Sequence, residues 1–157
     1  MRFLTALIFL ATVLIADNSS SYAQSDSEDV KVVIAAYHAA LGALNAGKMD
    51  PLWAHDDTVM LVEPFDKVIS LGWDAVKKNF DKEFAQLAEL KVTQADGPHI
   101  QVRGDVAWYT GMTNASVEFK EGPSVENAPT FETGVFEKRD GHWFLVSHTA
   151  FQVVRPR

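Results

Sequence analysis

The chain has 157 residues, which is the size of one domain with a hydrophobic core of its own. Its formal net charge is -7, and an acidic domain repels phosphate backbones, so we expect no nucleic acid partner. The sequence contains no cysteine, which excludes disulfides and thiol chemistry.

The first residues have the layout of a secretory signal. A positively charged start is followed by an apolar run over 3–16, and small residues at Ser21 and Ala23 match the positions that a signal peptidase reads. The run is shorter than the roughly 20 apolar residues of a membrane span, although an uncleaved anchor is the alternative. We therefore expect a signal peptide at 1–23 and a periplasmic or secreted domain at 24–157, with no membrane attachment after cleavage.

The first half of the mature chain predicts helices. Apolar residues recur at helical spacing over 30–44, which predicts one amphipathic helix that ends at Gly47. Ser25 is its expected N-terminal cap, and Glu28 completes a capping box. The remaining elements expected before the sheet are a short helix at 49–53, a hairpin of strands over 58–71 and a helix at 72–87.

From residue 89 onward the apolar pattern alternates with period two, as in strands. Helices that come first must cover one face of a sheet that comes later, and a twisted sheet wrapped around a long helix leaves a cavity at its open end. The predicted fold is therefore an α+β cone, with a curved antiparallel sheet around the N-terminal helices. We expect strands at 90–102 with a bend at Gly97-Pro98, at 106–119, at 131–138 after an exposed loop at 120–129, and at 142–154.

Four short segments of the sequence also resemble a known family. The segments are W-A-H-D-D at 53–57, G-W at 72–73, G-D-V-A-W at 104–108 and R-D-G-H-W-F-L-V-S-H at 139–148. Their order and spacing resemble the SnoaL-like branch of the nuclear transport factor 2-like superfamily. The layout is similar to ketosteroid isomerase and to the association domain of calcium/calmodulin-dependent kinase II. The resemblance implies the cone fold but no single function, because the superfamily includes isomerases, cyclases, dehydratases and assembly domains.

The site residues that the resemblance implies are only partly present. A ketosteroid isomerase-like site needs a tyrosine, which Tyr37 on the first helix can supply, and a general base that no carboxylate here matches. Gly134 and Ala150 stand where the kinase association domain carries pocket arginines, which argues against an anionic ligand. His99, after the bend, matches a histidine near that pocket. The alternative is an exposed loop histidine.

The best candidates for chemistry lie on the last two strands. Alternation puts Glu132 on one face of its strand and puts Phe144, Val146 and His148 on one face of the next, and the hairpin turn makes these the same face. A carboxylate beside an imidazole raises its basicity and fixes its tautomer. The alternatives are a structural pair or two residues on an outer face.

Three aromatic residues are further candidates for the pocket. Tyr37 either points its hydroxyl into the cavity or belongs to the core, and Trp53 either walls the cavity or serves packing alone. Tyr109 belongs to the pocket if its face of strand 106–119 lines it.

His55 and Asp56 form either a polar couple at the rim or part of an ordinary turn. The histidines lack the spacing of a metal site, and no cofactor is indicated.

The sequence thus predicts an exported domain whose mostly apolar pocket binds a small hydrophobic molecule, with no assigned reaction. One alternative is a ketosteroid isomerase-like or cyclase/dehydratase-like enzyme that uses His148, Glu132 or Tyr37 for acid–base proton transfer. Another is a purely structural dimer. A homodimer is expected in any case, because alternation puts apolar residues on the outer sheet face. These residues are Phe131, Val135, Trp143 and Leu145.

Overall fold

The structure is a computed structural model that describes the backbone of residues 16–153 and the side chains of residues 24–153. The elements follow in the order α1 (Ala16–Gly42), the 3-10 helix η1 (Ala46–Lys48), β1 (Met60–Val62), β2 (Ser70–Leu71), α2 (Trp73–Gln86), β3 (Leu87–Arg103), β4 (Val106–Phe119), β5 (Val125–Arg139) and β6 (His142–Gln152). The apolar run of the expected signal lies outside the described residues up to position 15, and α1 contains the expected cleavage site. Within the described part of the chain, no helix is long and apolar enough to cross a membrane.

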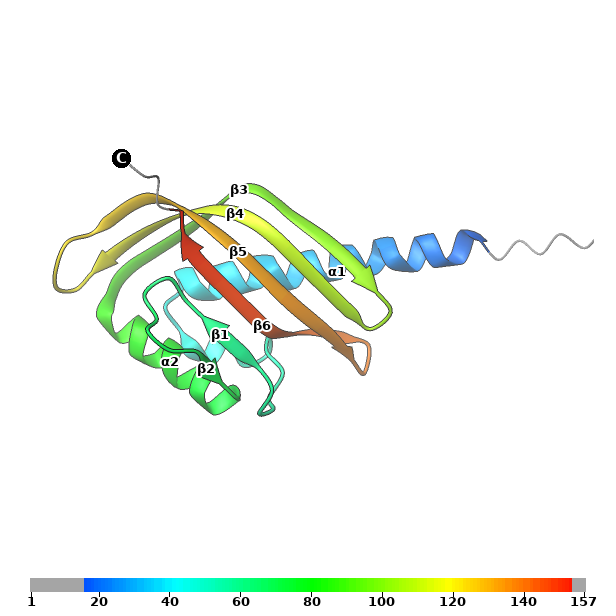
Figure 1. Ribbon diagram of the computed structural model, residues 1–157, viewed down its shortest axis with the longest axis horizontal. Helices are drawn as coiled ribbons and strands as arrows, with labels where there is room; N and C mark the ends of the chain where they lie inside the picture. Colours follow the sequence, from blue (N-terminus) through cyan, green and yellow to red (C-terminus); the bar gives the residue numbers. More distant parts are fainter. Residues whose placement is uncertain (1–15, 154–157) are drawn as a thin grey trace, which may run out of the picture.

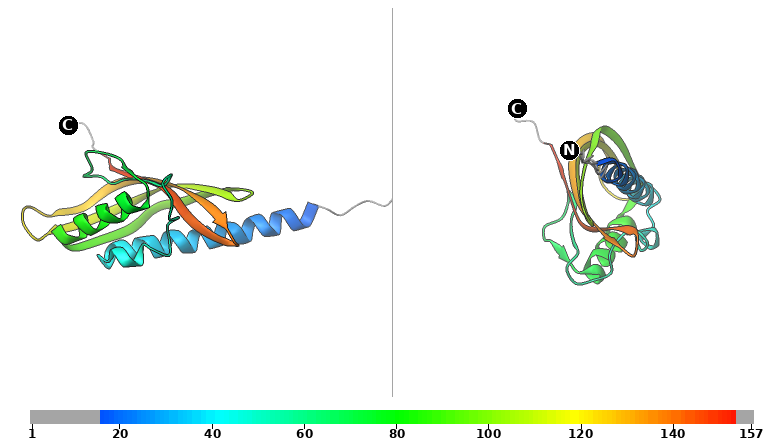
Figure 2. Two further views of the ribbon diagram at one scale, coloured as in Figure 1. Left: turned by 90° about the horizontal axis from the view of Figure 1, so that it is seen from below. Right: turned by 90° about the vertical axis from the view of Figure 1, so that its right-hand side faces the viewer.

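The strands form one curved sheet in the order β2-β1-β6-β5-β4-β3. Neighbouring strands are antiparallel except β1 and β6, which run parallel, so the sheet is not antiparallel throughout as expected. The long strands arch over α1, while α2 and the β1–β2 hairpin gather near the C-terminal end of α1 (Figure 1). The end-on view shows α1 inside the curve of the sheet (Figure 2). This arrangement is the expected cone.

Several helix boundaries differ from the prediction. Helix α1 begins before Ser25, which therefore does not cap it, and it ends at Gly42 instead of Gly47. Leu44 adopts a left-handed conformation with φ 49°, which stops the helix, and the Asn45 side chain accepts a hydrogen bond from the Gly47 amide to open η1. No second helix forms at 49–53.

The sheet extends further than the composition suggests. Strand β5 begins at Val125, so the second half of the predicted loop at 120–129 pairs with β4 instead. The Pro129 carbonyl also accepts a hydrogen bond from the Val153 amide, 2.8 Å away. The expected bend at Gly97-Pro98 is present as a break in the register between β3 and β4.

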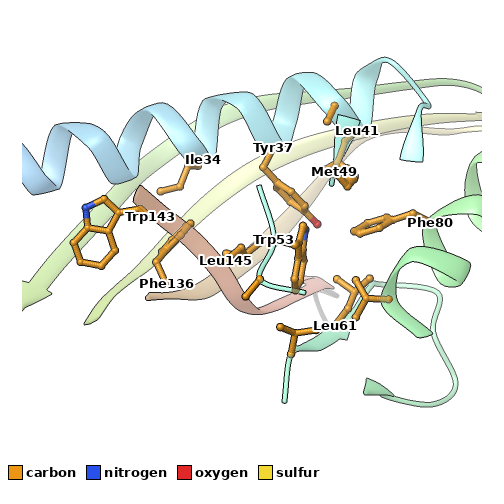
Figure 3. Close-up of a cluster of buried hydrophobic side chains, with 14 of the residues drawn as sticks. Ile34, Tyr37, Leu41, Met49, Trp53, Leu61, Phe80, Phe136, Trp143 and Leu145 are labelled. Atoms are coloured by element: carbon orange, nitrogen blue, oxygen red, sulfur yellow. The ribbon is translucent and has the colours of Figure 1, made fainter. Parts of the chain in front are cut away.

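The core lies between α1, α2 and the concave face of the sheet. The helical stripe predicted on α1 is confirmed, because Val30, Ile34, Tyr37 and Leu41 are all buried. These residues meet large side chains from the other elements (Figure 3). The partners include Met49, Trp53, Leu61, Phe80, Phe136, Trp143 and Leu145.

A β-bulge at Val146 reverses the side-chain alternation along β6. Phe136 pairs with Leu145 and Val135 pairs with Ser147, which leaves Val146 without a partner. As a result Trp143 and Leu145 face the core before the bulge, and His148 faces it after the bulge.

Because of the bulge, two expectations differ from the structure. Phe144 and Val146 do not share a face with His148, although Glu132 and His148 do lie on the same inner face. The prediction that Trp143 and Leu145 lie on the outer face was also wrong, since they are 4% and 1% exposed.

Candidate functional site

A cavity of about 110 Å³ lies where the C-terminal end of α1, the end of α2 and the strands β3 to β6 meet. Its wall is mostly apolar. The apolar lining comes from Leu41, Pro64, Phe65, Leu87, Leu90, Val92, Ala115, Val117, Phe119 and Ala150, and the polar lining from Glu63, Glu83, Gln86, Thr113, Thr130, Glu132, His148 and Gln152.

His148 lies at the inner end of this cavity between two carboxyl groups. Its Nδ1 atom is 3.4 Å from Glu63 Oε1, and its Nε2 atom is 3.7 Å from Glu132 Oε2. The Tyr37 hydroxyl lies 3.3 Å from Nδ1 and donates a 2.8 Å hydrogen bond to Glu63 Oε1. The Tyr109 hydroxyl lies 3.1 Å from Nε2. The imidazole is therefore enclosed by four polar side chains.

This environment makes His148 a strong base. Burial by itself lowers the pKa of His148, but the hydrogen bonds and charges of Glu132 and Glu63 outweigh it and raise the pKa to about 9. Burial by itself raises the pKa of Glu132, but hydrogen bonds from His148 and His38 lower it to about 2. Both groups are consequently charged at neutral pH, as a buried ion pair.

The two tyrosines act as neutral hydrogen-bonding groups. Burial raises the pKa of Tyr37 well above its ordinary value, and the neighbouring Glu63 raises it further. Burial, followed by the charge of Glu132, also raises the pKa of Tyr109. Since neither phenol ionises at neutral pH, each can donate one hydrogen bond. The Tyr109 ring packs over Gly134, where a Cβ atom would come within 2.6 Å of Tyr109 Cε1.

His38 approaches the same cluster from α1. Its Nε2 atom is 3.2 Å from Glu132 Oε2, to which it bonds, and 3.0 Å from Glu132 Oε1. Glu132 Oε1 is buried and has no hydrogen-bond partner. One oxygen of this carboxylate thus remains an acceptor without a donor.

Glu83, on α2, is a further acid in the cavity wall. Burial raises the pKa of Glu83, and the charges of Glu63 and Asp66 raise it further, to about 8. The carboxyl group of Glu83 is therefore mostly protonated at neutral pH. Asp66 itself accepts hydrogen bonds from the Glu63 amide and the Asn79 side chain.

The structure brings together four of the residues singled out in the sequence. Glu132 and His148 line the cavity, while Tyr37 and Tyr109 bond to His148 behind its wall. Trp53 does not line the cavity. It is 1% exposed and packs against Tyr37 and Phe80, with ring centroids 6.4 Å and 6.1 Å away.

Three other candidate residues lie away from the cavity. The side chain of His99 is 64% exposed and its Nε2 atom is 3.3 Å from Asp96, because the bend in β3 turns this residue outward. The expectation of a pocket histidine at His99 was wrong. His55 stacks on Trp73 and Asp56 pairs with Arg139, both outside the cavity wall. Among residues 24–153, no three His, Asp or Glu side chains form a metal-binding group.

Three members of the site were not identified from the sequence, although the spacing of apolar residues places each of them on the buried side of its element. Glu63 follows the buried Val59 and Leu61 with period two. His38 lies one helical turn after Ile34, and Glu83 lies one turn after Phe80. Each is a titratable residue on an otherwise apolar stripe, and this was the signal available.

The α1 helix held within a curved, open sheet defines a cone of the nuclear transport factor 2-like class. The fold is similar to that of a proposed dehydratase of the NTF2-like family from Streptomyces avermitilis, with 24% identity, a TM-score of 0.73, and coverage of 84% of this chain and 99% of that one. It is also similar to an NTF2-like superfamily protein from Salmonella enterica, with 15% identity, a TM-score of 0.74, and coverage of 88% and 96%.

A third similar structure is a proposed calcium/calmodulin-dependent protein kinase type II association domain from Thiobacillus denitrificans. It has 18% identity, a TM-score of 0.66, and coverage of 79% of this chain and 94% of that one. The chain belongs to the SnoaL-like domain family, whose model matches residues 30–152. A comparison with curated proteins gives no match.

Proposed function

We propose that this protein is an exported binding protein for a small, largely apolar molecule, which enters the cavity with its polar end toward the ion pair of Glu132 and His148. The observation that carries the proposal is a buried ion pair in the wall of a mostly apolar cavity. Well-packed apolar residues stabilise a core at least as well as a buried ion pair does. A role for these charges in binding explains why they are there. The pattern of residues 1–23 supports export.

The size of the cavity limits the part of the ligand that is enclosed. A cavity of roughly 150 Å³ holds a benzene molecule, so a cavity of about 110 Å³ holds a somewhat smaller group. A longer ligand extends past Phe65, which lines the cavity, is 49% exposed and has its ring centroid 5.8 Å from that of Phe119.

Filling the cavity tests this proposal. Ala115 lines the cavity, so an Ala115→Phe substitution occupies the space that the ligand needs. In thermal unfolding with a series of 1-alkanols, we expect the midpoint of the unmodified protein to rise with alkanol concentration, because a ligand that binds only the folded state stabilises it. The Ala115→Phe variant should not respond. An Ala39→Phe variant, changed at an exposed position of α1, should respond like the unmodified protein. Equal responses of the cavity variant and the unmodified protein would contradict the proposal.

Acid–base catalysis is the second candidate function. Two groups of the cavity wall carry a proton at neutral pH: His148, whose pKa is about 9, and the carboxyl group of Glu83, whose pKa is about 8. The carboxylate of Glu132, whose pKa is about 2, is ionised and lines the same cavity. Shifted acid and base groups in one cavity are typical of proton-transfer sites. The similarity to a proposed dehydratase is compatible with this function. A His148→Ala variant that turns over an identified substrate at the unmodified rate would remove His148 from such a mechanism.

We also propose that the convex face of the sheet forms a homodimer. Trp108 and Phe151 on this face are 38% and 50% exposed, and half-buried apolar residues surround them. The surrounding residues are Met112, Phe131, Val135, Phe144 and Val146. A row of threonines at 110, 133 and 149 crosses this face, but exposed aromatic and aliphatic side chains gathered in this way are typical of an interface.

Sedimentation velocity at micromolar concentration tests the dimer. We expect the unmodified protein to sediment as a dimer and a Trp108→Glu, Phe151→Glu double variant to sediment as a monomer, because two charges per chain cannot be buried unpaired. A Val32→Glu variant, changed at an exposed position of α1, should remain a dimer. A monomeric unmodified protein would exclude this interface.

A further inference from the structure

The cavity contains more carboxyl groups than basic groups. Glu63, Glu83 and Glu132 all contribute to its wall. Among the described residues, His148 is the one basic side chain in that wall, and neither lysine nor arginine is part of it. The charged groups of the cavity therefore favour a cation over an anion.

His148 offers little to an anionic ligand. Its Nδ1 atom already faces the Tyr37 hydroxyl at 3.3 Å and Glu63 at 3.4 Å. Its Nε2 atom faces the Tyr109 hydroxyl at 3.1 Å. A carboxylate or phosphate group would have to displace these partners and then lie beside buried carboxylates, which is strongly unfavourable in a poorly solvated site.

Glu132 provides an unsatisfied acceptor. The residue is 3% exposed, it lines the cavity, and its Oε1 atom has no hydrogen-bond partner. His38 Nε2 is near this atom but bonds to Oε2. A ligand that donates a hydrogen bond to Oε1 would satisfy a buried charged group, and such bonds are stronger than those between neutral groups.

Glu83 is protonated at neutral pH because it is buried among negative charges, and a cation bound nearby would favour its ionised form. Burial and the carboxylates of Glu63 and Asp66 raise the pKa of Glu83, and the charge of Lys82 opposes them only in part. A positive ligand group near these carboxyl groups would stabilise the ionised form of Glu83. Binding of a cation is then expected to release a proton.

We propose that the cavity binds a primary amine with an apolar tail, whose ammonium group lies among the carboxyl groups and donates to Glu132 Oε1. The tail lies against the apolar wall formed by residues such as Leu87, Val92 and Val117. This inference rests on the proposed binding function, because it names the chemical class of the molecule that the same cavity takes.

Three probes of equal chain length test the inference by isothermal titration calorimetry on the full chain at pH 7. We expect n-hexylamine to bind about tenfold or more tightly than 1-hexanol, and hexanoate to show no binding, because the three share a six-carbon chain and differ in the charge and hydrogen bonding of the polar end. If 1-hexanol binds and hexylamine binds no more tightly, the amine inference fails and the binding function stands. If none of the three binds, the binding function fails as well.

Titrations of variants, and titrations in different buffers, test whether the carboxyl groups bind hexylamine. Glu132→Gln and Glu83→Gln should each weaken hexylamine binding by about tenfold and change hexanol binding little. Glu118→Gln, a matched change at an exposed position of β4, should leave both unchanged. Titrations in buffers of different ionisation enthalpy should show proton release on hexylamine binding and none in the Glu83→Gln variant. Equal hexylamine affinity of the unmodified protein and the Glu132→Gln and Glu83→Gln variants would overturn the inference.

Discussion

Replacing His148 by alanine is expected to lower the free energy of unfolding at neutral pH by about 3–5 kcal/mol, because it leaves a buried carboxylate without its partner. Glu132 is 3% exposed, lies 3.7 Å from His148 as an ion pair and hydrogen-bonds to His38, so the substitution removes one of its two basic partners. On the other side of the ring, Glu63 is 8% exposed and loses the same partner. Urea denaturation followed by fluorescence gives the value.

A second histidine on the same strand serves as the control. His142 is exposed at the start of β6, so a His142→Ala variant should change the free energy of unfolding by no more than about 0.5 kcal/mol. If the two variants lose the same small amount, the carboxylates around His148 are not held by the imidazole, and the ion-pair interpretation of the site is wrong.

Glu132 and His148 by themselves would make the fold most stable between about pH 4.5 and 6.5, and their pKa values give the direction in which stability changes on each side of this range. Glu132 has a folded-state pKa of about 2 against an ordinary 4.5, so its contribution is present above 4.5 and is lost as the pH falls towards 2. His148 has a folded-state pKa of about 9 against 6.5, so its contribution is full below 6.5 and is lost as the pH rises through 9. The pKa shift of His148 alone corresponds to a contribution of about 3 kcal/mol to the free energy of unfolding.

Because of Glu83, the stability of the fold begins to fall at a lower pH than His148 alone would make it fall. Its pKa is raised from 4.5 to about 8, so the folded state holds this proton more tightly than the unfolded state does, and stability falls as the pH rises from 4.5 to 8. Urea denaturation at intervals from pH 3 to pH 9 measures the curve. A Glu83→Gln variant should lose less stability between pH 5 and pH 8 than the unmodified protein. A curve that is flat from pH 4 to pH 9 would contradict the charge states assigned to this site.

The fold could be predicted from the sequence because its elements depend on local patterns. The apolar stripe of α1 and the alternation along β4 follow directly from burial on one side, and both are present in the structure. The boundaries that differ depend on particular contacts. Leu44 stops α1 in a left-handed conformation that is rare for leucine, and the loop after Lys120 is shortened by pairing with β4.

The site was predictable only in part, because alternation gives the face of a residue and not its neighbours. Glu132 and His148 reach the same cavity as expected, but the face expected for Leu145 was wrong, since a single unpaired residue in β6 changes the phase. Glu63 and His38 come from segments far away in the sequence, and only the packing of α1 and β1 against the sheet brings them to His148 and Glu132.

Gly134 and Tyr109 have a consequence for how this pocket can change over time. Gly134 pairs with His148 on one side and with Tyr109 on the other, and its missing side chain is the space that the Tyr109 ring occupies. A larger residue at position 134 of β5 and an aromatic ring at position 109 of β4 thus exclude each other. A descendant that acquired a long basic side chain at position 134 would also have to give up the phenol at position 109, and with it a hydrogen-bond partner of His148. Two substitutions on separate strands therefore form one evolutionary step.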